Sequence, residues 1–290
     1  MMQTRDDGSN AGPATSDQLR HRRERTWLEV LGTATVVAVL LVIAVRTLTH
    51  VVLPALLTHY TPFPALADAP KRTATPSGKP ADPVNIALVG TADEVRSAMR
   101  AAGWVLADSL SRASDIAIAK SVLLNRPDST APVSTLFLLG HRQDVAFEQE
   151  VGRSARQRHH VRLWLDPAIE YQGRSVWLGS ATYDARAGLS HRTFRPTHHI
   201  APDVDEERDA LAAALVHAQQ VLQTFRVTGM GVRVWAHNGE DDRFDTDGEL
   251  RVLVLSPGNA LHAAPTDPEV PPLVALKDRL WQWGHHFARG

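Results

Sequence analysis

The sequence predicts an α+β domain with a mixed β-sheet and flanking helices, preceded by one transmembrane helix. Three observations lead to this prediction: a long apolar run near the N-terminus, an early strand–helix unit, and later segments in which apolar and polar residues alternate. An early strand–helix unit followed by hairpins is typical of a sheet that mixes parallel and antiparallel strands.

The composition excludes several classes of function. The 290-residue chain carries a formal net charge of −1, so no strong overall field attracts nucleic acid, and we expect no nucleic-acid partner. The chain contains no cysteine, which excludes disulfides, thiolate metal ligands and cysteine nucleophiles.

An apolar run follows the polar N-terminus. We interpret residues 1–26 as a disordered cytoplasmic tail and residues 27–49 as a transmembrane helix. The run is apolar on all faces and, at about 1.5 Å per residue, spans roughly the 30 Å hydrocarbon core of a bilayer. A buried helix of a soluble domain is the alternative, but such a helix is normally shorter. The predicted partner of residues 27–49 is therefore the lipid bilayer.

The flanking arginines predict an orientation. Four arginines lie between residues 20 and 25, whereas only Arg46 follows the run before Lys71. Basic residues stay on the cytoplasmic side of a span. The small-residue sequence at 65–67 lies too far beyond the run for signal-peptide cleavage. We therefore expect a single-pass protein of the cell membrane, with its N-terminus in the cytoplasm and its C-terminal domain extracytoplasmic.

The remainder divides into three parts. Residues 50–82 are rich in Pro, Ala, Thr and Ser, which predicts a linker. The folded domain is expected over 83–256, and residues 257–290 form a Pro-rich linker and a C-terminal amphipathic helix. The apolar stripe of that helix comprises Leu273, Leu276, Leu280, Trp281 and Trp283. The stripe packs on its own domain in one interpretation and contacts the membrane interface through its tryptophans in the other.

Within the domain, hydrophobic periodicity and turn residues mark the elements. Thr91 and Glu94 form a capping box, and Asp203 is placed as the N-cap of an acidic helix. Strands are predicted at 84–89, 104–107, 134–140, 145–151, 159–165, 175–183, 223–227 and 250–255, and helices after residue 91, at 114–125 and at 203–220.

Two histidine pairs are the first candidates for chemistry. Because side chains alternate along a strand, His159 lies with the apolar Val161 and Leu163, whereas His160 lies on the opposite, polar face. Each pair can then contribute one side chain to a shared site, completed by a carboxylate. The candidate catalytic residues are His160, His199, Asp203, Asp184 and Asp247.

Two histidines and a carboxylate would suit Zn²⁺ or non-haem iron. The chain lacks HExxH and any other spacing that places ligands on one helix face, so we predict no metal ligand set and leave the cofactor unknown. The alternative interpretation is that these histidines are structural and hydrogen-bond to backbone and carboxylate groups. For Asp203 the alternative is the helix cap already described.

A second set of residues is a candidate for binding. Arginine forks suit bidentate recognition of phosphate, although an arginine-rich run is more often a solvated loop. The candidate binding residues are Arg158, Arg162, His159 and His198. An acidic loop at 241–249 hints at Ca²⁺, but it lacks the EF-hand spacing and fits a solvated turn.

A series of short blocks, in order, resembles the LssY-like C-terminal domain family. The blocks lie at 82–91, 131–134, 144–148, 158–164, 176–184, 198–203, 207–209 and 246–248. The resemblance implies no particular reaction; some family members are fused to membrane phosphatase-like and DedA-like domains, which implies an envelope or phospholipid setting. The chain departs from the expected Asn–Gly–Gly–Gly–Asp loop, since residues 238–242 read Asn–Gly–Glu–Asp–Asp.

Two functions remain open at this point. The first is a membrane-anchored domain that binds an envelope component or a membrane partner, such as a membrane protein or a phospholipid-related ligand. The second is a membrane-anchored, phosphoesterase-like hydrolase that uses the His/Asp cluster. The hydrolase needs a histidine from each pair within about 4–5 Å of one carboxylate in an open cleft. The binding domain needs an exposed apolar patch.

Overall fold

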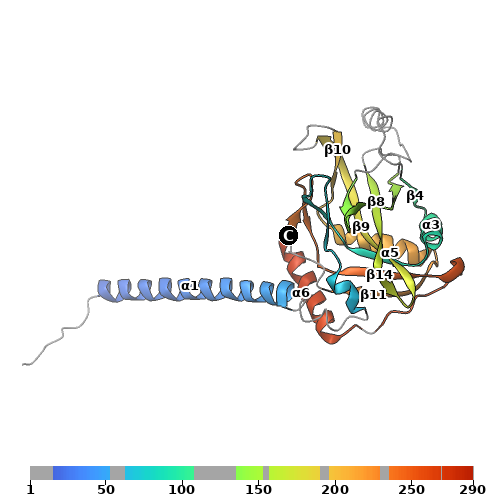
Figure 1. Ribbon diagram of the computed structural model, residues 1–290. Helices are drawn as coiled ribbons and strands as arrows, with labels where there is room; N and C mark the ends of the chain where they lie inside the picture. Colours follow the sequence, from blue (N-terminus) through green and yellow to red (C-terminus); the bar gives the residue numbers. More distant parts are fainter. Residues whose placement is uncertain are drawn as a thin grey trace, which may run out of the picture. The chain divides into compact units, whose positions relative to one another are not determined.

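The computed structural model describes residues 16–52, 63–107, 135–152, 157–189, 196–228, 235–268 and 270–289. The chain divides into two compact units between Leu48 and Thr49. Mixed sheets with flanking helices confirm the predicted α+β class (Figure 1). The predicted helix at 114–125 lies outside the described residues.

The first unit is the helix α1 (Ser16–Thr47), which the short π-helix η1 (Leu48–Val52) follows. The prediction of a disordered tail over residues 1–26 is corrected from Ser16 onward, because the helix already begins there. Its stretch Glu29–Thr47 has a mean hydropathy of 2.2, and none of it is buried inside the fold. The hydroxyls of Thr33 and Thr35 each donate to a carbonyl one turn earlier at 2.8 Å, so neither needs water. This helix is long and apolar enough to cross a membrane.

An eight-stranded sheet organises the second unit. Its strands are β3 (Ile86–Val89), β4 (Val105–Leu106), β7 (Val145–Glu150), β8 (Arg158–Tyr171), β9 (Arg174–Leu189), β10 (Pro196–Ile200), β11 (Val221–Val227) and β14 (Leu250–Leu255). Seven of them are paired in the order β11-β14-β3-β9-β8-β7-β4. The eighth, β10, lies off this path and pairs with β9. Only the β14–β3 pair of this sheet is parallel. The sheet is therefore mixed, as the sequence predicts.

The hairpin of β8 and β9 forms the longest ladder. A two-residue turn joins the strands, and Gln172 and Gly173 both have positive φ, of 53° and 72°. This conformation matches the right-handed twist of the flanking strands. Opposite residues include His160 with Thr182 and Val161 with Ala181, so the turn sets which side chains share a face.

The helices α3 (Ala92–Ala101) and α5 (Val204–His217) cover one face of the sheet. The predicted capping box of α3 is present, with Thr91 and Glu94 each accepting from the other's backbone N–H. The core on this face includes Leu88, Phe147 and Val161 with Leu211 of α5. His159 lies on this same face, as the alternation predicts, because it contacts Glu207 of α5.

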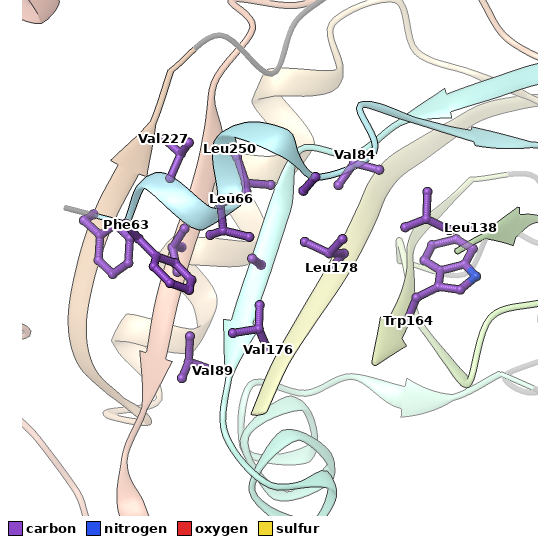
Figure 2. Packing of buried hydrophobic residues seen from close by; sticks show 14 of the residues in the cluster. Phe63, Leu66, Val84, Val89, Leu138, Trp164, Val176, Leu178, Val227 and Leu250 are labelled. Atoms are coloured by element: carbon purple, nitrogen blue, oxygen red, sulfur yellow. The ribbon is translucent and has the colours of Figure 1, made fainter. Parts of the chain in front are cut away.

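The opposite face is covered by chain that the sequence analysis predicts to be linker. This chain contains η3 (Pro64–Asp68), β1 (Arg72–Ala74) and β2 (Pro80–Pro83), and the two strands join β5 (Phe137–Leu138) and β6 (His141–Arg142) in a four-stranded sheet. Leu66 is fully buried against this face, near Val89, Val176 and Leu178 (Figure 2). The linker prediction for 50–82 is thus corrected from Phe63 onward, because Phe63, Leu66, Ala69 and Ala81 belong to the core on this face.

Two further predictions need adjustment. The expected strand at 134–140 is instead the short hairpin of β5 and β6. The segment after residue 256 contains the turn η4 (Pro257–Asn259) and then runs beside β11, where Thr266 N donates to Leu222 O at 3.1 Å.

The remaining hairpin, β12 (Trp235–His237) with β13 (Arg243–Asp245), is separate from both sheets. The predicted C-terminal helix is α6 (Pro272–Arg289).

The covering segment can be tested by truncating Leu66. Replacing this fully buried side chain with alanine leaves a cavity, and Leu66→Ala should lower the free energy of unfolding by about 2–5 kcal/mol. The measurement is chemical denaturation of the purified chain. Leu261→Ala is the matched control, because Leu261 is 69% exposed and should change stability by less than about 0.5 kcal/mol. Equal stability of the two variants would contradict this packing.

Candidate functional site

Two rows of polar side chains face each other on the sheet face opposite the helices. Arg158, His160 and Arg162 alternate along β8, and their partners across the ladder are Asp184, Thr182 and Ser180 of β9. All six side chains are buried. Because buried polar groups require partners, the contacts made by these rows determine what the face can do.

Asp184 is the centre of this cluster. Its Oδ2 lies 2.8 Å from His160 Nε2 and 3.6 Å from His198 Nδ1 of β10. Burial alone would raise the pKa of Asp184, but the pairing and hydrogen bond with His160, together with His198 and Arg162, outweigh burial and lower it to about 2. One histidine from each predicted pair therefore meets one of the predicted carboxylates.

His199, the other candidate on β10, lies in a different place. Its Nδ1 is 2.7 Å from Asp242 Oδ1, and a Cβ on Gly188 would come within 2.8 Å of its Nε2. Asn238 holds Asp242 in position for this contact. Its side-chain oxygen accepts a hydrogen bond from the Asp242 N–H at 2.9 Å, within the turn between β12 and β13. His199 is thus held by a tight turn rather than by Asp184.

The two candidate arginines are paired with buried acids. Arg158 NH1 lies 3.2 Å from Glu148 Oε2 on β7, and Arg162 NH1 lies 3.5 Å from Asp82 Oδ2 on β2. Burial raises the pKa of Asp82 despite the opposing charge of Arg162, and the nearby Asp184 carboxylate raises it further. Neither arginine belongs to a solvated loop.

His159 stands apart from the other three histidines. Its Nδ1 lies 2.6 Å from Glu207 Oε2, and its ring packs beside those of Trp104 and Tyr183. Burial raises the pKa of Glu207, while the hydrogen bond and charge of His159 oppose this rise. The four histidines are therefore divided among three carboxylates on different parts of the fold.

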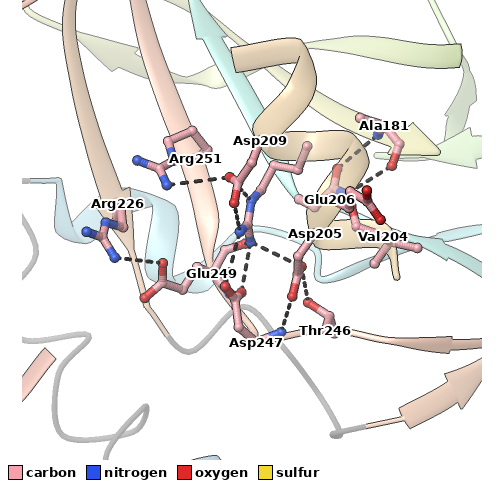
Figure 3. A network of polar contacts seen from close by, with 12 residues as sticks. Ala181, Val204, Asp205, Glu206, Asp209, Arg226, Thr246, Asp247, Glu249 and Arg251 are labelled. Atoms are coloured by element: carbon pink, nitrogen blue, oxygen red, sulfur yellow. Dashed lines mark hydrogen bonds and ion pairs between the residues drawn. The ribbon is translucent and has the colours of Figure 1, made fainter. Parts of the chain in front are cut away.

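A second polar network lies at the start of α5, where Asp205, Asp209 and Asp247 surround a guanidinium group (Figure 3). The guanidinium of Arg208 binds both oxygens of Asp247, at 2.8 and 3.1 Å, and also contacts Asp205 and Asp209. The side chain of Asp205 accepts in turn from the Asp247 N–H at 2.5 Å and from the Thr246 hydroxyl at 2.9 Å. Arg208 is 2% exposed, so this network joins α5 to the chain before β14 from within the core.

Asp203 begins the same helix. Its Oδ1 accepts from the backbone N–H groups of Asp205 and Glu206, each at 3.2 Å, which confirms the predicted N-cap. Asp203 therefore caps α5 and Asp247 pairs with Arg208 of that helix, whereas His160, His198 and Asp184 form the cluster on the sheet.

A family model that covers most of the folded domain identifies the family of this chain. The family model described as LssY C-terminus matches residues 66–250. The chain belongs to the LssY C-terminus family. No curated protein and no solved structure matches the chain. The matched region begins at Leu66, and so it includes most of the covering segment that the sequence alone suggests to be linker.

Several residues of the LssY domain site are not among the candidates that the sequence predicts. Asp82, Glu148, Glu207 and Asp242 each pair with a candidate residue, yet they come from four different elements or turns. The position of Asp242 in an acidic loop is a weak signal, and the other three are marked only by lying in blocks of the family resemblance, at 82–91, 144–148 and 207–209. The departure at 238–242 keeps Gly239, where a side chain would overlap the Thr75 methyl group, so this glycine serves packing.

The described part of the LssY domain contains no group of three or more histidine, aspartate or glutamate side chains arranged to hold a metal ion. Among the buried polar atoms of the cluster face, His160 Nδ1, Ser180 Oγ and Arg158 Nε make no hydrogen bond within the described part of the chain. Buried polar atoms of this kind are usually satisfied by ordered water.

Asp205 should make the stability of the LssY domain depend on pH. Burial and the neighbouring Asp247 carboxylate raise the pKa of Asp205 from 3.8 to about 7, although Arg208 opposes the rise. The folded state then binds more protons than the unfolded state across this range, so stability should fall as the pH is raised through it. Asp205→Asn keeps an oxygen acceptor and removes the titration, and should therefore flatten the decline.

Chemical denaturation at a series of pH values would measure this effect. Asp93→Asn is the control, because the Asp93 side chain is 95% exposed at the start of α3. Parallel stability curves for the wild type and Asp205→Asn would contradict the assignment.

Proposed function

We propose that the chain is a single-pass protein of the cell membrane whose extracytoplasmic LssY domain binds an envelope component or a membrane partner. The observation that carries the proposal is the uncovered apolar stretch Glu29–Thr47, which the chain does not bury in its own fold. A cluster of arginines precedes it and the folded domain follows. By the positive-inside rule, these arginines favour a cytoplasmic N-terminus.

The burial of the histidine cluster and the exposure of apolar side chains on α6 favour a binding function over catalysis. The side chains of His160 and Asp184 are only 5% and 11% exposed, so a substrate would have little access to them in this conformation. By contrast, Leu273, Leu276 and Trp283 of α6 leave large apolar areas in solvent. A membrane protein or a phospholipid-related molecule is the kind of ligand that such a surface and setting suit.

The orientation is tested with reporter fusions. Alkaline phosphatase or β-lactamase fused after Gly290 should be active, because both require export and the proposed domain is extracytoplasmic. A second fusion placed before the arginine cluster serves as the control and should be inactive. Activity of a cytoplasmic reporter at the C-terminal site would overturn the proposed topology.

A second candidate function is a phosphoesterase-like hydrolase centred on His160. One specific observation favours it: His160 and His198 share the carboxylate of Asp184, which can orient an imidazole for proton transfer. The unpartnered Nδ1 of His160 would be the atom that takes the proton, and Arg158 and Arg162 would neutralise a phosphoryl group.

The hydrolase candidate predicts a defined pattern of losses. The purified full chain should hydrolyse p-nitrophenyl phosphate esters, and His160→Ala and Asp184→Asn should reduce kcat by about 10²-fold or more through the lost acid–base group. His217→Ala should retain full activity, because His217 lies exposed at the end of α5. Equal rates in His160→Ala and His217→Ala would dismiss the candidate.

A further inference from the structure

The helix α6 is attached to the LssY domain along one face. Val274 is 5% exposed and packs with Val270, and Asp278 lies one turn later. The Asp278 carboxylate accepts a hydrogen bond from Arg226 NH1 of β11 at 2.6 Å. Residues four apart lie on the same side of a helix, so Val274 and Asp278 define the side that faces the domain.

The opposite side of α6 carries an apolar stripe. Leu273, Leu276 and Trp283 are 49%, 45% and 62% exposed, and Leu280 between them is half-buried. Their spacings of three, four and three residues follow the helical period, so they form one continuous row. A row of three leucines and a tryptophan at the surface of a folded domain marks an interaction site.

The charges of α6 indicate what lies against this row. Its sequence contains the basic residues Lys277, Arg279 and Arg289 and a single acid, Asp278, which is paired with Arg226. The helix therefore contributes net positive charge. Leucine and tryptophan on one side with Lys and Arg in the same helix are typical of helices that lie in the interface of an anionic bilayer.

The position of the domain along the chain adds a second argument. Eleven residue steps separate Val52, at the end of the N-terminal helical segment, from Phe63, where the folded domain begins. Even when fully extended, this stretch reaches only about 40 Å. A domain tethered so closely meets a bilayer at a high effective concentration, so a weak interfacial helix would remain bound.

We propose that α6 is an interfacial membrane helix. Leu273, Leu276, Leu280 and Trp283 enter the headgroup region of the bilayer that holds Glu29–Thr47, and the exposed Arg279 contacts anionic headgroups. This inference rests on the membrane anchoring proposed above. It adds a second point of contact, which restrains how the LssY domain is presented to the membrane surface.

The absence of cysteine from the chain allows a direct test. Single-cysteine variants Leu276→Cys and Trp283→Cys of the full chain are labelled with the fluorophore NBD and reconstituted in vesicles of phosphatidylcholine and phosphatidylglycerol. Lipids with a nitroxide near the headgroup should quench both labels several-fold, and their emission should shift to the blue. Thermal melting of each variant confirms that the domain remains folded.

Two further labels make the outcomes distinguishable. Val37→Cys, within the apolar helix, reports the anchor, and Leu261→Cys, 69% exposed outside α6, reports a position expected in water. Quenching at 276 and 283 by the headgroup nitroxide and at 37 by a nitroxide on the acyl chain, but none at 261, supports the proposal. Quenching at 37 alone overturns the interfacial helix while the anchor stands, and loss of quenching at 37 overturns both. Blue-shifted labels on α6 that lipid nitroxides do not quench would assign the stripe to a protein partner or a second copy, against the proposal.

Discussion

The pairing register of β8 with β9 is the constraint on which both faces of the LssY domain depend. The two-residue turn at Gln172 and Gly173 sets the register, and alternation then separates the side chains into two sets. Val161 and Leu163 form the floor on which α5 packs, while His160 and Arg162 lie on the other side. A slip of one residue would exchange these sets, placing charges under the helices and apolar side chains in the polar cluster.

Buried charges add a second requirement to this register. Asp184 joins three neighbouring strands through His160 and His198, and Arg208 joins α5 to the chain before β14 through Asp247. Removing one partner from such a contact leaves a buried charge uncompensated, which typically costs about 3–5 kcal/mol. Because the partners are far apart in the sequence, these contacts can all form only when every strand has its correct neighbours. The polar residues therefore favour one arrangement of the chain over its alternatives.

Local patterns explain which parts of this structure the sequence predicts. The capping box at Thr91, the cap at Asp203 and the division of His159 from His160 each depend on neighbours within a few residues, and each is confirmed. The sequence does not predict the covering segment from Phe63 to Pro83, because Pro and Ala dominate its composition and the burial of Leu66 depends on strands more than a hundred residues later. Asp242 was missed as the partner of His199 for the same reason, since only the fold brings β10 beside the β12–β13 turn.

The polar cluster on the sheet and the helix α6 differ in charge, and this difference limits what each can attract. On the sheet face, Arg72, Arg158 and Arg162 lie near three carboxylates, those of Asp82, Glu148 and Asp184. The three arginines and the three carboxylates balance in formal charge, so an anion approaching the cluster would meet little net attraction. The helix α6 differs, because its one acid is already paired and its other charged residues are basic. Long-range attraction to an anionic membrane is therefore available at α6, whereas the sheet cluster can select a ligand only through short-range hydrogen bonds after contact is made.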